Sequence, residues 1–472
     1  MLTIAITYIL LLFAIQRFTA KKDANETFFR GERNSPWYAV AFGMVGASVS
    51  GVSFVSVPGW ITSTNFHYLQ TCIGFIVGYL LVARVLLPVY YRNNLTSIYE
   101  YLEQRFSLSA RRTGSAFFLL SKLMGAAVRL YIVCLILQQF VLSAYGFSFA
   151  QTALLVIGII YLYTRRGGIR TIVFTDCLQT FVMLACIFVI LCVVTGRMGL
   201  DFGGTMHHVL SSPYARVFEW QDFSSSQHFL KQFFSGIFIV LVMTGLDQDM
   251  MQKNLTCRTL AESQRNMCCY GLLFLPVNLL FLVLGVLLHS YAQGLGIQAT
   301  GDQLLPSLCL GGFLGHGAML LFSLGIMAAC MSSADSAMTS LTTSICVDIC
   351  RRQEDNRLRR LMHPFVGLAM LGLVCFIYYI GSSSAIDTVY VLASYTYGPL
   401  LGLFAFGLFT KRQVRGRWLP FVCLAAIGIT YALDRCSFLY WHYKFGYELL
   451  MINGLLAMMG MFISSFGIQR RR

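Results

Sequence analysis

The sequence predicts an all-α polytopic membrane protein with about thirteen transmembrane helices. Hydrophobic residues make up 57% of its 472 positions and charged residues only 12%, about half the share that is typical of soluble domains. Long apolar stretches recur from one end of the chain to the other. The net charge of +15 comes largely from Lys and Arg in the short polar breaks between these stretches, so we expect a lipid bilayer and no nucleic acid as partner.

Each expected span is an apolar run between polar or Gly- and Pro-containing breaks. The first run lacks the basic start and the small-residue cleavage site of a signal peptide, so we interpret it as a short transmembrane helix. In chain order, the expected spans are 2–17, 36–64, 67–91, 114–144, 149–164, 171–195, 229–251, 268–291, 314–348, 362–380, 384–410, 418–434 and 446–468.

The distribution of basic residues predicts the orientation of the chain. When successive breaks are assigned to alternate sides, most of the 35 Lys and Arg fall on one side. Because short cytoplasmic loops carry an excess of Lys and Arg, we expect the N-terminus outside and the C-terminus in the cytoplasm. The expected cytoplasmic segments are 17–35, 92–112, 165–170, 252–267, 351–361, 411–417 and the tail arginines Arg470 to Arg472.

The span 314–348 carries the most informative polar residues. It contains AACMSSADSAMTSL, which places Ser332, Ser333 and Asp335 in the middle of an otherwise apolar helix. A carboxylate in hydrocarbon costs roughly 2.5–3.5 kcal/mol on insertion scales, so its presence indicates a function. Hydroxyl and carboxylate oxygens suit a small hard cation. We therefore predict an ion-binding site inside the membrane.

Two spans contain residues that interrupt a helix. The span 36–64 contains VGASVSGVSFVSVPGW, and five spans later the helix that starts near 229 runs into TGLDQDMMQ. Broken helices at corresponding positions of two halves indicate a transporter binding site. The unwound carbonyls must bind an ion, water or substrate. A Gly- and Ser-rich packing face is the alternative for either span taken alone.

Five segments resemble the sodium/solute symporter family, in the family's order. The resemblance covers nearly the whole chain and implies the LeuT-type fold, an inverted repeat of five helices plus five, here with one extra N-terminal and two extra C-terminal helices. On that scheme 1–472 is a single transporter domain, with the first repeat at 36–195 and the second at 229–410. The segments are LTSIYEYLEQRF (95–106), GGIRTIVFTDCLQ (167–179), GLDQDMMQKNLTC (245–257), AACMSSADSAMTSL (328–341) and SYTYGPLLGLFAFGLF (394–409).

The resemblance implies a main sodium site between the break of the first core helix and the eighth core helix. The implied ligands are the carbonyls of Gly46, Val49 and Ala329 and the hydroxyls of Ser332 and Ser333. Ala329, Ser332 and Ser333 are spaced i, i+3 and i+4, so they share one helix face. The alternative is that the two serines only pack against neighbouring helices.

In relatives that resemble sialic-acid transporters, a second sodium lies near an Asp on the fifth core helix and two hydroxyls on the eighth. Asp176 matches that Asp, and the hydroxyl positions fall at Asp335 and Ser336. One hydroxyl is therefore replaced by a carboxylate. Asp176 and Asp335 could hold a second sodium, share a proton, or hydrogen-bond to neighbouring helices.

The resemblance also implies a substrate cavity between the broken helices. Ser50 and Ser53 match polar contact positions, and Asp247 matches an amide beside the sugar in sugar-transporting relatives. Tyr68 and Gln70 are further polar groups that could reach the cavity. Each of these side chains could instead form an interhelical hydrogen bond.

Arg129 is the strongest indication of the substrate's charge. It lies in mid-span, too deep to reach the interface easily, so it must face a polar cavity or an acid such as Asp176, Asp247 or Asp335. In a cavity, its planar fork would suit a substrate carboxylate. An intramembrane ion pair is an equal alternative, since the carboxylate-binding Arg of sialic-acid-type relatives aligns near Gly125.

Together these residues predict a sodium-coupled symporter, with Na+ as the coupling ion and no obligate protein partner. We expect it to import a sugar acid, a monocarboxylate or a related small polar solute across a bacterial plasma membrane by alternating access. A proton-coupled symporter, a sensor with a transporter fold, and a neutral sugar as substrate are the alternatives. No enzyme is expected, because His207 and His208 lie in a polar loop without a catalytic cluster.

Overall fold

The computed structural model describes residues 2–20, 23–223, 225–380, 383–441, 443, 445–446 and 448–465. Within these ranges the regular structure is helical, and the only β-pairing is an isolated bridge between Ser35 and Cys257. The predicted all-α class is therefore confirmed. The tail arginines Arg470 to Arg472, which helped to predict the orientation, lie outside the described residues.

The helices of the first half of the chain begin close to the predicted spans. They are α1 (Leu2–Thr19), α2 (Asn25–Arg30), α3 (Trp37–Ser48), α4 (Gly51–Gly59), α5 (Ile61–Thr64), α6 (Tyr68–Leu81), α7 (Leu87–Arg92), α8 (Glu100–Arg105), α9 (Leu108–Leu137), α10 (Phe149–Thr164) and α11 (Ile169–Arg197). The short 3-10 or π-helical turns among them are η1 (Gly31–Arg33), η2 (Asn65–His67), η3 (Val82–Leu86), η4 (Gln138–Leu142) and η5 (Ser143–Tyr145).

The second half continues in the same way after a partly helical connection between α11 and α13. Its helices are α12 (Phe202–Leu210), α13 (Phe229–Val240), α14 (Gln248–Asn254), α15 (Leu260–Gly294), α16 (Leu304–Leu310), α17 (His316–Ser344), α18 (Asn356–Ile380), α19 (Ser383–Phe409), α20 (Leu419–Trp441) and α21 (Glu448–Ser465). The short turns are η6 (Pro213–Ala215), η7 (Leu241–Gly245), η8 (Gly301–Gln303), η9 (Ile345–Ile349) and η10 (Gly416–Trp418).

The number of membrane spans is only partly fixed by helix length. Among the described residues, 8 helices are long and apolar enough to cross a membrane, or up to 10 if each bent pair is one span. Three shorter apolar helices occupy the predicted first, fifth and eleventh spans: Thr3–Thr19, Phe149–Thr164 and Tyr395–Phe409. The positions of the spans agree with the prediction, whereas the count of thirteen is not confirmed.

Both predicted helix interruptions are confirmed. The chain bends by 63° between α3 and α4, and by 71° between the Phe229–Gly245 stretch and α14. At the first bend, Val49 leaves the helical conformation (φ −79°, ψ 87°), and Ser50 then caps α4. At the second, Asp247 caps α14 by accepting hydrogen bonds from the amides of Asp249 and Met250. Polar caps therefore make each break locally stable.

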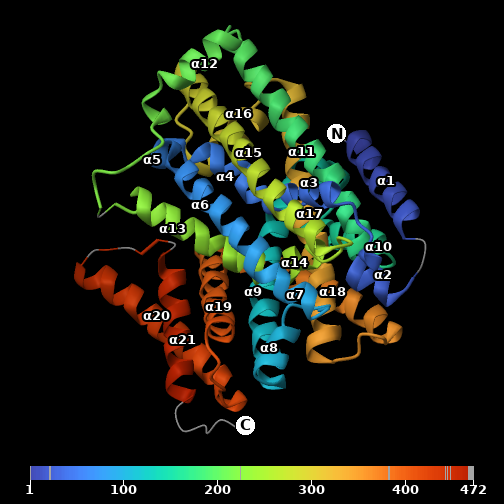
Figure 1. The fold of residues 1–472 in the computed structure, drawn as a ribbon. Coiled ribbons are helices and arrows are strands. Elements are labelled where there is room, and N and C mark those ends of the chain that lie inside the picture. The colour runs from blue at the N-terminus through green and yellow to red at the C-terminus, as the bar shows by residue number, and fades with distance from the viewer. Residues whose placement is uncertain are drawn as a thin grey trace.

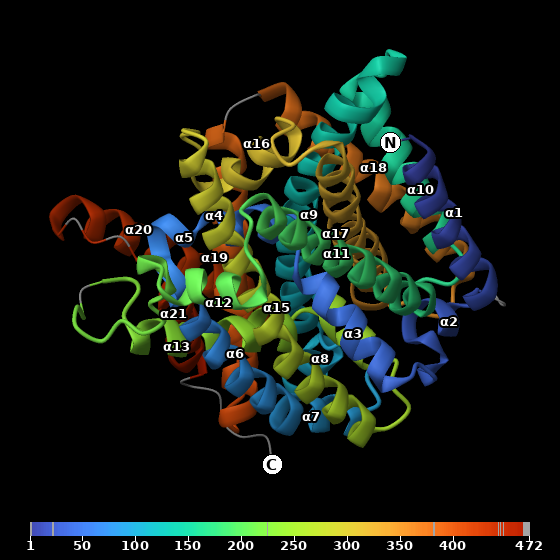
Figure 2. The ribbon, with the colours of Figure 1, turned by 90° about the horizontal axis from the view of Figure 1, so that it is seen from above.

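Helix α17 lies in the interior of the bundle. The most apolar window of the span that contains it is 72% buried, whereas the windows containing α20 and α21 are only 22% and 28% buried. Figures 1 and 2 show α17 surrounded by neighbouring helices, with α1 and the α20–α21 pair on opposite sides of the molecule. The serines and the carboxylate of α17 are therefore placed where solvent and lipid reach least.

Candidate ion and substrate site

The break between α3 and α4 removes two carbonyl groups from the helical hydrogen-bond ladder. In a continuous helix the amide of Ser50 would bond to Gly46, but it bonds to the Ser48 carbonyl at 3.1 Å. The amide of Ser53, which would bond to Val49, lies 3.4 Å from the Ser50 hydroxyl oxygen instead. The carbonyls of Gly46 and Val49 therefore lack these helical partners, as a cation site requires.

Small residues hold this break close to two neighbouring helices. A side chain on Gly51 would overlap Sγ of Cys330, one residue after Ala329 on α17. A side chain on Gly46 would overlap the hydroxyl of Thr180 on α11. Close approach through glycine is a common means of helix packing in membranes. Here it places the α3–α4 break between α11 and the Ala329 turn of α17.

The two serines of the predicted main sodium site are buried, with 0% and 2% of Ser332 and Ser333 exposed. Ser332 donates its hydroxyl proton to Oδ1 of Asp176 at 2.6 Å. Ser333 donates to the carbonyl of Ala329 at 3.3 Å. A hydroxyl has one proton and two lone pairs, so both serine oxygens keep lone pairs that can coordinate a cation.

The residues of the predicted second sodium site also come together. Asp176 and Asp335 are both 0% exposed and interact electrostatically. Oδ2 of Asp335 accepts a hydrogen bond from the hydroxyl of Tyr163 at 2.6 Å. Oδ1 of Asp335 and the hydroxyl of Ser336 are buried without a hydrogen-bond partner among the described residues. This polar group lies beside the main site and is joined to it through Ser332.

Sequence reasoning missed Lys253. We predicted it in a cytoplasmic break, and that placement is wrong: the residue is 1% exposed, and its ammonium lies 2.8 Å from Oδ2 of Asp176. The sharp bend before α14 directs this short helix back into the protein and brings Lys253 to α11. The available signal was its position inside the GLDQDMMQKNLTC segment, directly after the second interruption.

A second group of buried charges surrounds Asp247. Lys122 of α9 lies 3.3 Å from Asp247 and 2.7 Å from Asp249, and Tyr397 of α19 donates to Asp247 at 3.1 Å. Arg129 interacts electrostatically with Asp249 and Tyr397. The structure therefore brings Arg129 and Asp247 into one polar group, with Lys122 as a further cation that we did not predict.

The remaining predicted substrate residues lie in two places, at the break between α3 and α4 and at the start of α6. Ser50 and Ser53 have hydroxyl oxygens 3.4 Å apart at the start of α4, directly at the break. Tyr68 packs edge-on against Trp60, with ring centroids 5.4 Å apart. Gln70 is 0% exposed, and its side-chain amide bonds to the backbone of the connection between α11 and α13, at Gln227 and Glu219. Gln70 therefore anchors that connection and is not brought to the charged group.

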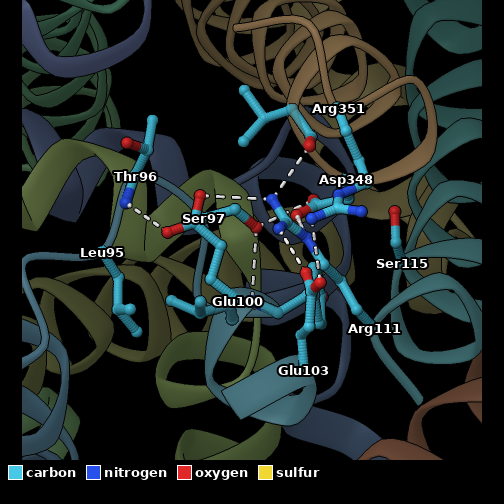
Figure 3. A network of polar contacts seen from close by, with 12 residues as sticks. Leu95, Thr96, Ser97, Glu100, Glu103, Arg111, Ser115, Asp348 and Arg351 are labelled. Atoms are coloured by element: carbon cyan, nitrogen blue, oxygen red, sulfur yellow. Dashed lines mark hydrogen bonds and ion pairs between the residues drawn. The ribbon is translucent and has the colours of Figure 1, made fainter. Parts of the chain in front are cut away.

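A further ionic network lies at the far end of α17, on the side that the basic residues assign to the cytoplasm (Figure 3). Arg111 of α9 bonds to Asp348 at 2.9 Å, to Glu103 at 2.8 Å and to Glu100 at 3.2 Å. Ser97 and Ser344 both donate to Asp348 at 2.8 Å. The network ties the 95–106 segment to α9 and to the end of α17.

Residues 28–416 match the sodium:solute symporter family. This stretch covers well over half of the chain and contains every candidate residue described above.

The chain belongs to the sodium:solute symporter family.

The members that it resembles are transporters, not enzymes. This symporter-family chain is 26% identical to the sodium/sialic acid symporter NanT of Aliivibrio fischeri, over 84% of this chain and 80% of that protein. It is 28% identical to the sodium-dependent multivitamin transporter of Oryctolagus cuniculus, over 78% of this chain and 59% of that protein. It covers 61% of the human sodium/iodide cotransporter. The chain thus spans about three fifths of the length of the last two relatives.

Solved structures confirm the predicted LeuT-type fold. A Na+-coupled sialic acid symporter, in a substrate-bound outward-open state, superimposes with a TM-score of 0.83 at 19% identity, covering 98% of this chain and 97% of that one. Mhp1, a nucleobase-cation-symport-1 family transporter, gives a TM-score of 0.58 at 14% identity, covering 94% and 95%. At such low identity these likenesses establish the fold of the symporter-family chain and leave its substrate open.

Proposed function

We propose that the chain is a sodium-coupled symporter that imports a small polar organic solute by alternating access. The observation that carries this proposal is the break of α3. It takes the carbonyls of Gly46 and Val49 out of the helical ladder, next to the α17 turn that bears Ser332 and Ser333. Carbonyl and hydroxyl oxygens are the ligands that hard cations take in proteins. Membership of the family supports Na+ as that cation.

We propose an anionic solute, such as a sugar acid or a monocarboxylate. Lys122 and Arg129 place two cationic side chains in the polar group around Asp247. The N-terminus of α4, at Ser50, adds the positive end of a helix dipole at the break. The names of three relatives give sialic acid, iodide and monocarboxylate as cargo, all of them anions.

The two breaks also support the proposed domain organisation. One lies in the proposed first repeat (36–195) and the other in the proposed second repeat (229–410), at the start of each. We place the protein in the plasma membrane with its N-terminus outside and its C-terminus in the cytoplasm, because the basic residues gather in one set of breaks.

A proton-coupled symporter is the second candidate. Asp335 supports it, because Oδ1 of this buried carboxylate has no hydrogen-bond partner among the described residues. Buried carboxylates inside a membrane serve as proton carriers as well as ion ligands.

Uptake into proteoliposomes tests the proposal. The purified chain is reconstituted and offered radiolabelled sialic acid, lactate, iodide and glucose, with an inward Na+ gradient or with a proton gradient in Na+-free buffer. We expect Na+-driven uptake of sialic acid or lactate, the two organic anions, and uptake of iodide alone would contradict an organic solute. Equal uptake with the proton gradient alone would establish proton coupling. Uptake of glucose alone would make the solute neutral, and saturable binding without uptake would indicate a sensor.

A further inference from the structure

We propose that the ammonium group of Lys253 occupies the place of a second sodium ion beside Asp176, so that the chain binds a single sodium ion. This inference rests on the proposed sodium symport and fixes its ion number. It also assigns a role to Lys253, a buried cation that contacts the Asp176 side chain.

The geometry around Asp176 leaves little room for a free cation. Oδ2 lies 2.8 Å from the Lys253 ammonium, and Oδ1 accepts the Ser332 hydroxyl at 2.6 Å. With its amide nitrogen turned toward the carboxylate, Gln179 lies 3.2 Å from Oδ1. Oδ1 of Asp176 is therefore supplied with hydrogen-bond donors, and Oδ2 with an ion pair, by the chain itself. A second sodium ion would have to displace one of them.

The second broken helix explains why Lys253 reaches this position. Asp247 caps α14 after the 71° bend, and the short helix then carries Lys253 inward until its side chain is 1% exposed. A tethered ammonium competes with free sodium as an intramolecular ligand, so no ion has to be taken up from solution to occupy this place. The covalent tether also means that this cation is not released with the solute.

The balance of charge around the two breaks independently limits the number of free cations in the solute-free protein. Around the two breaks, the described residues include four carboxylates, Asp176, Asp247, Asp249 and Asp335, and three cationic side chains, Lys122, Arg129 and Lys253. With all four carboxylates ionised and all three cations charged, this group carries one net negative charge. One sodium ion neutralises it. A second would leave uncompensated positive charge in a medium of low dielectric constant, at high cost.

The rival position for a second sodium is one turn further along α17. Oδ1 of Asp335 and the hydroxyls of Ser336 and Thr339 are buried without hydrogen-bond partners among the described residues. These oxygens could coordinate a cation without displacing Lys253. The two arrangements predict different numbers of bound ions, so counting the ions separates them.

Equilibrium binding of radioactive sodium to the purified protein in detergent needs no knowledge of the solute. We expect one ion per wild-type chain, with an affinity that falls about tenfold in Ser333→Ala. Two ions per chain would overturn the inference directly. One ion with unchanged affinity in Ser333→Ala would also overturn it, because that ion would sit at the rival position. No bound sodium at all would refute the sodium symport on which the inference rests.

Substitution of Lys253 gives the complementary test. Lys253→Met frees Oδ2 of Asp176, and we expect a second sodium ion to bind. Lys253→Arg keeps a tethered cation and should stay at one ion, which controls for the change of side chain. Lys253→Met combined with Asp176→Asn should return to one ion. A monodisperse Lys253→Met protein that still binds one ion would overturn the inference. If Lys253→Met does not fold, the wild-type count and Ser333→Ala still decide it.

Discussion

The hydroxyl of Ser332 on α17 donates a hydrogen bond to Asp176 on α11 at 2.6 Å. The same serine is a proposed ligand of the main sodium site, so it would join that site to Asp176. Its neighbour Ser333 donates within its own helix, to the carbonyl of Ala329. The two adjacent serines therefore differ in what their removal should do.

Replacement of Ser333 by Ala should weaken sodium binding about tenfold or more. The change removes one ligand oxygen, and a contact to a charge is worth roughly 1.5–3 kcal/mol. Titration of sodium-dependent uptake, or of bound radioactive sodium, measures the effect. Ser332→Ala should weaken sodium binding similarly and also lower the melting temperature, because Asp176 loses a donor. Ser340→Ala is the matched control, since its hydroxyl bonds to Ala337 on the same helix at 3.1 Å. Equal sodium affinity in all three variants would remove the serines from the site.

Replacement of Arg129 by Lys should weaken transport of acids. If the guanidinium holds a substrate carboxylate through two hydrogen bonds, Lys can supply only a point charge, and the KM for the acid should rise about tenfold. If Arg129 serves only its electrostatic interaction with Asp249, Lys should keep most of the function. Competition between labelled sialic acid and unlabelled acids in proteoliposomes measures the difference. An unchanged KM for every acid would assign Arg129 to the structure alone.

Replacement of Arg111 by Ala should destabilise the protein strongly. Asp348 is 0% exposed and would lose its cationic partner, and breaking a buried ion pair typically costs about 3–5 kcal/mol. Thermal unfolding in detergent should show a large drop in the melting temperature. Arg112→Ala changes the exposed neighbouring residue and should have little effect. Adding Asp348→Asn to Arg111→Ala should recover part of the loss, and no recovery would contradict the assigned pair.

Replacement of Gly236 by Ala should disrupt the contact between α6 and α13. A side chain at Gly236 would overlap the carbonyl oxygen of Thr71, and one at Gly74 would overlap that of Phe233. Overpacking of this kind costs about 1–3 kcal/mol, so the melting temperature should fall in either variant. Gly158→Ala has open space around it and should be neutral or stabilising, since Ala favours the helix. Equal melting temperatures in Gly236→Ala and Gly158→Ala would contradict the close approach.

The α17 residues were predictable because their signal is local. Asp335 and two serines in an apolar span are unusual whatever surrounds them, and the resemblance to a family added their partners. Lys253 was not predictable in this way, because its burial depends on the direction that α14 takes after a bend. Gln70 was predicted to reach the substrate cavity, but its side chain bonds to the connection between α11 and α13. Hydropathy does not reveal which neighbour a polar side chain meets.

The position of the first break illustrates the same limit. The segment offers several helix-breaking residues, among them Gly46, Gly51 and Pro58, and the sequence does not rank them. In the structure the helix ends at Ser48 and resumes at Gly51, while Pro58 lies inside α4. Capping by Ser50 decides the position, because its hydroxyl accepts from the next turn. Such a cap depends on local backbone geometry that composition does not report.

The proposed ion ligand Ser333 and Asp348, the partner of Arg111, lie on one continuous helical segment. Asp348 follows Ser333 by about four helical turns, which at 1.5 Å per residue is a distance of about 22 Å. Over that length α17 and η9 form a continuous rod enclosed by other helices. A rigid helix transmits a shift at one end to the other without any relay of side chains. We therefore expect an ion that displaces the Ser333 turn along the helix axis to displace Asp348 relative to Arg111 as well.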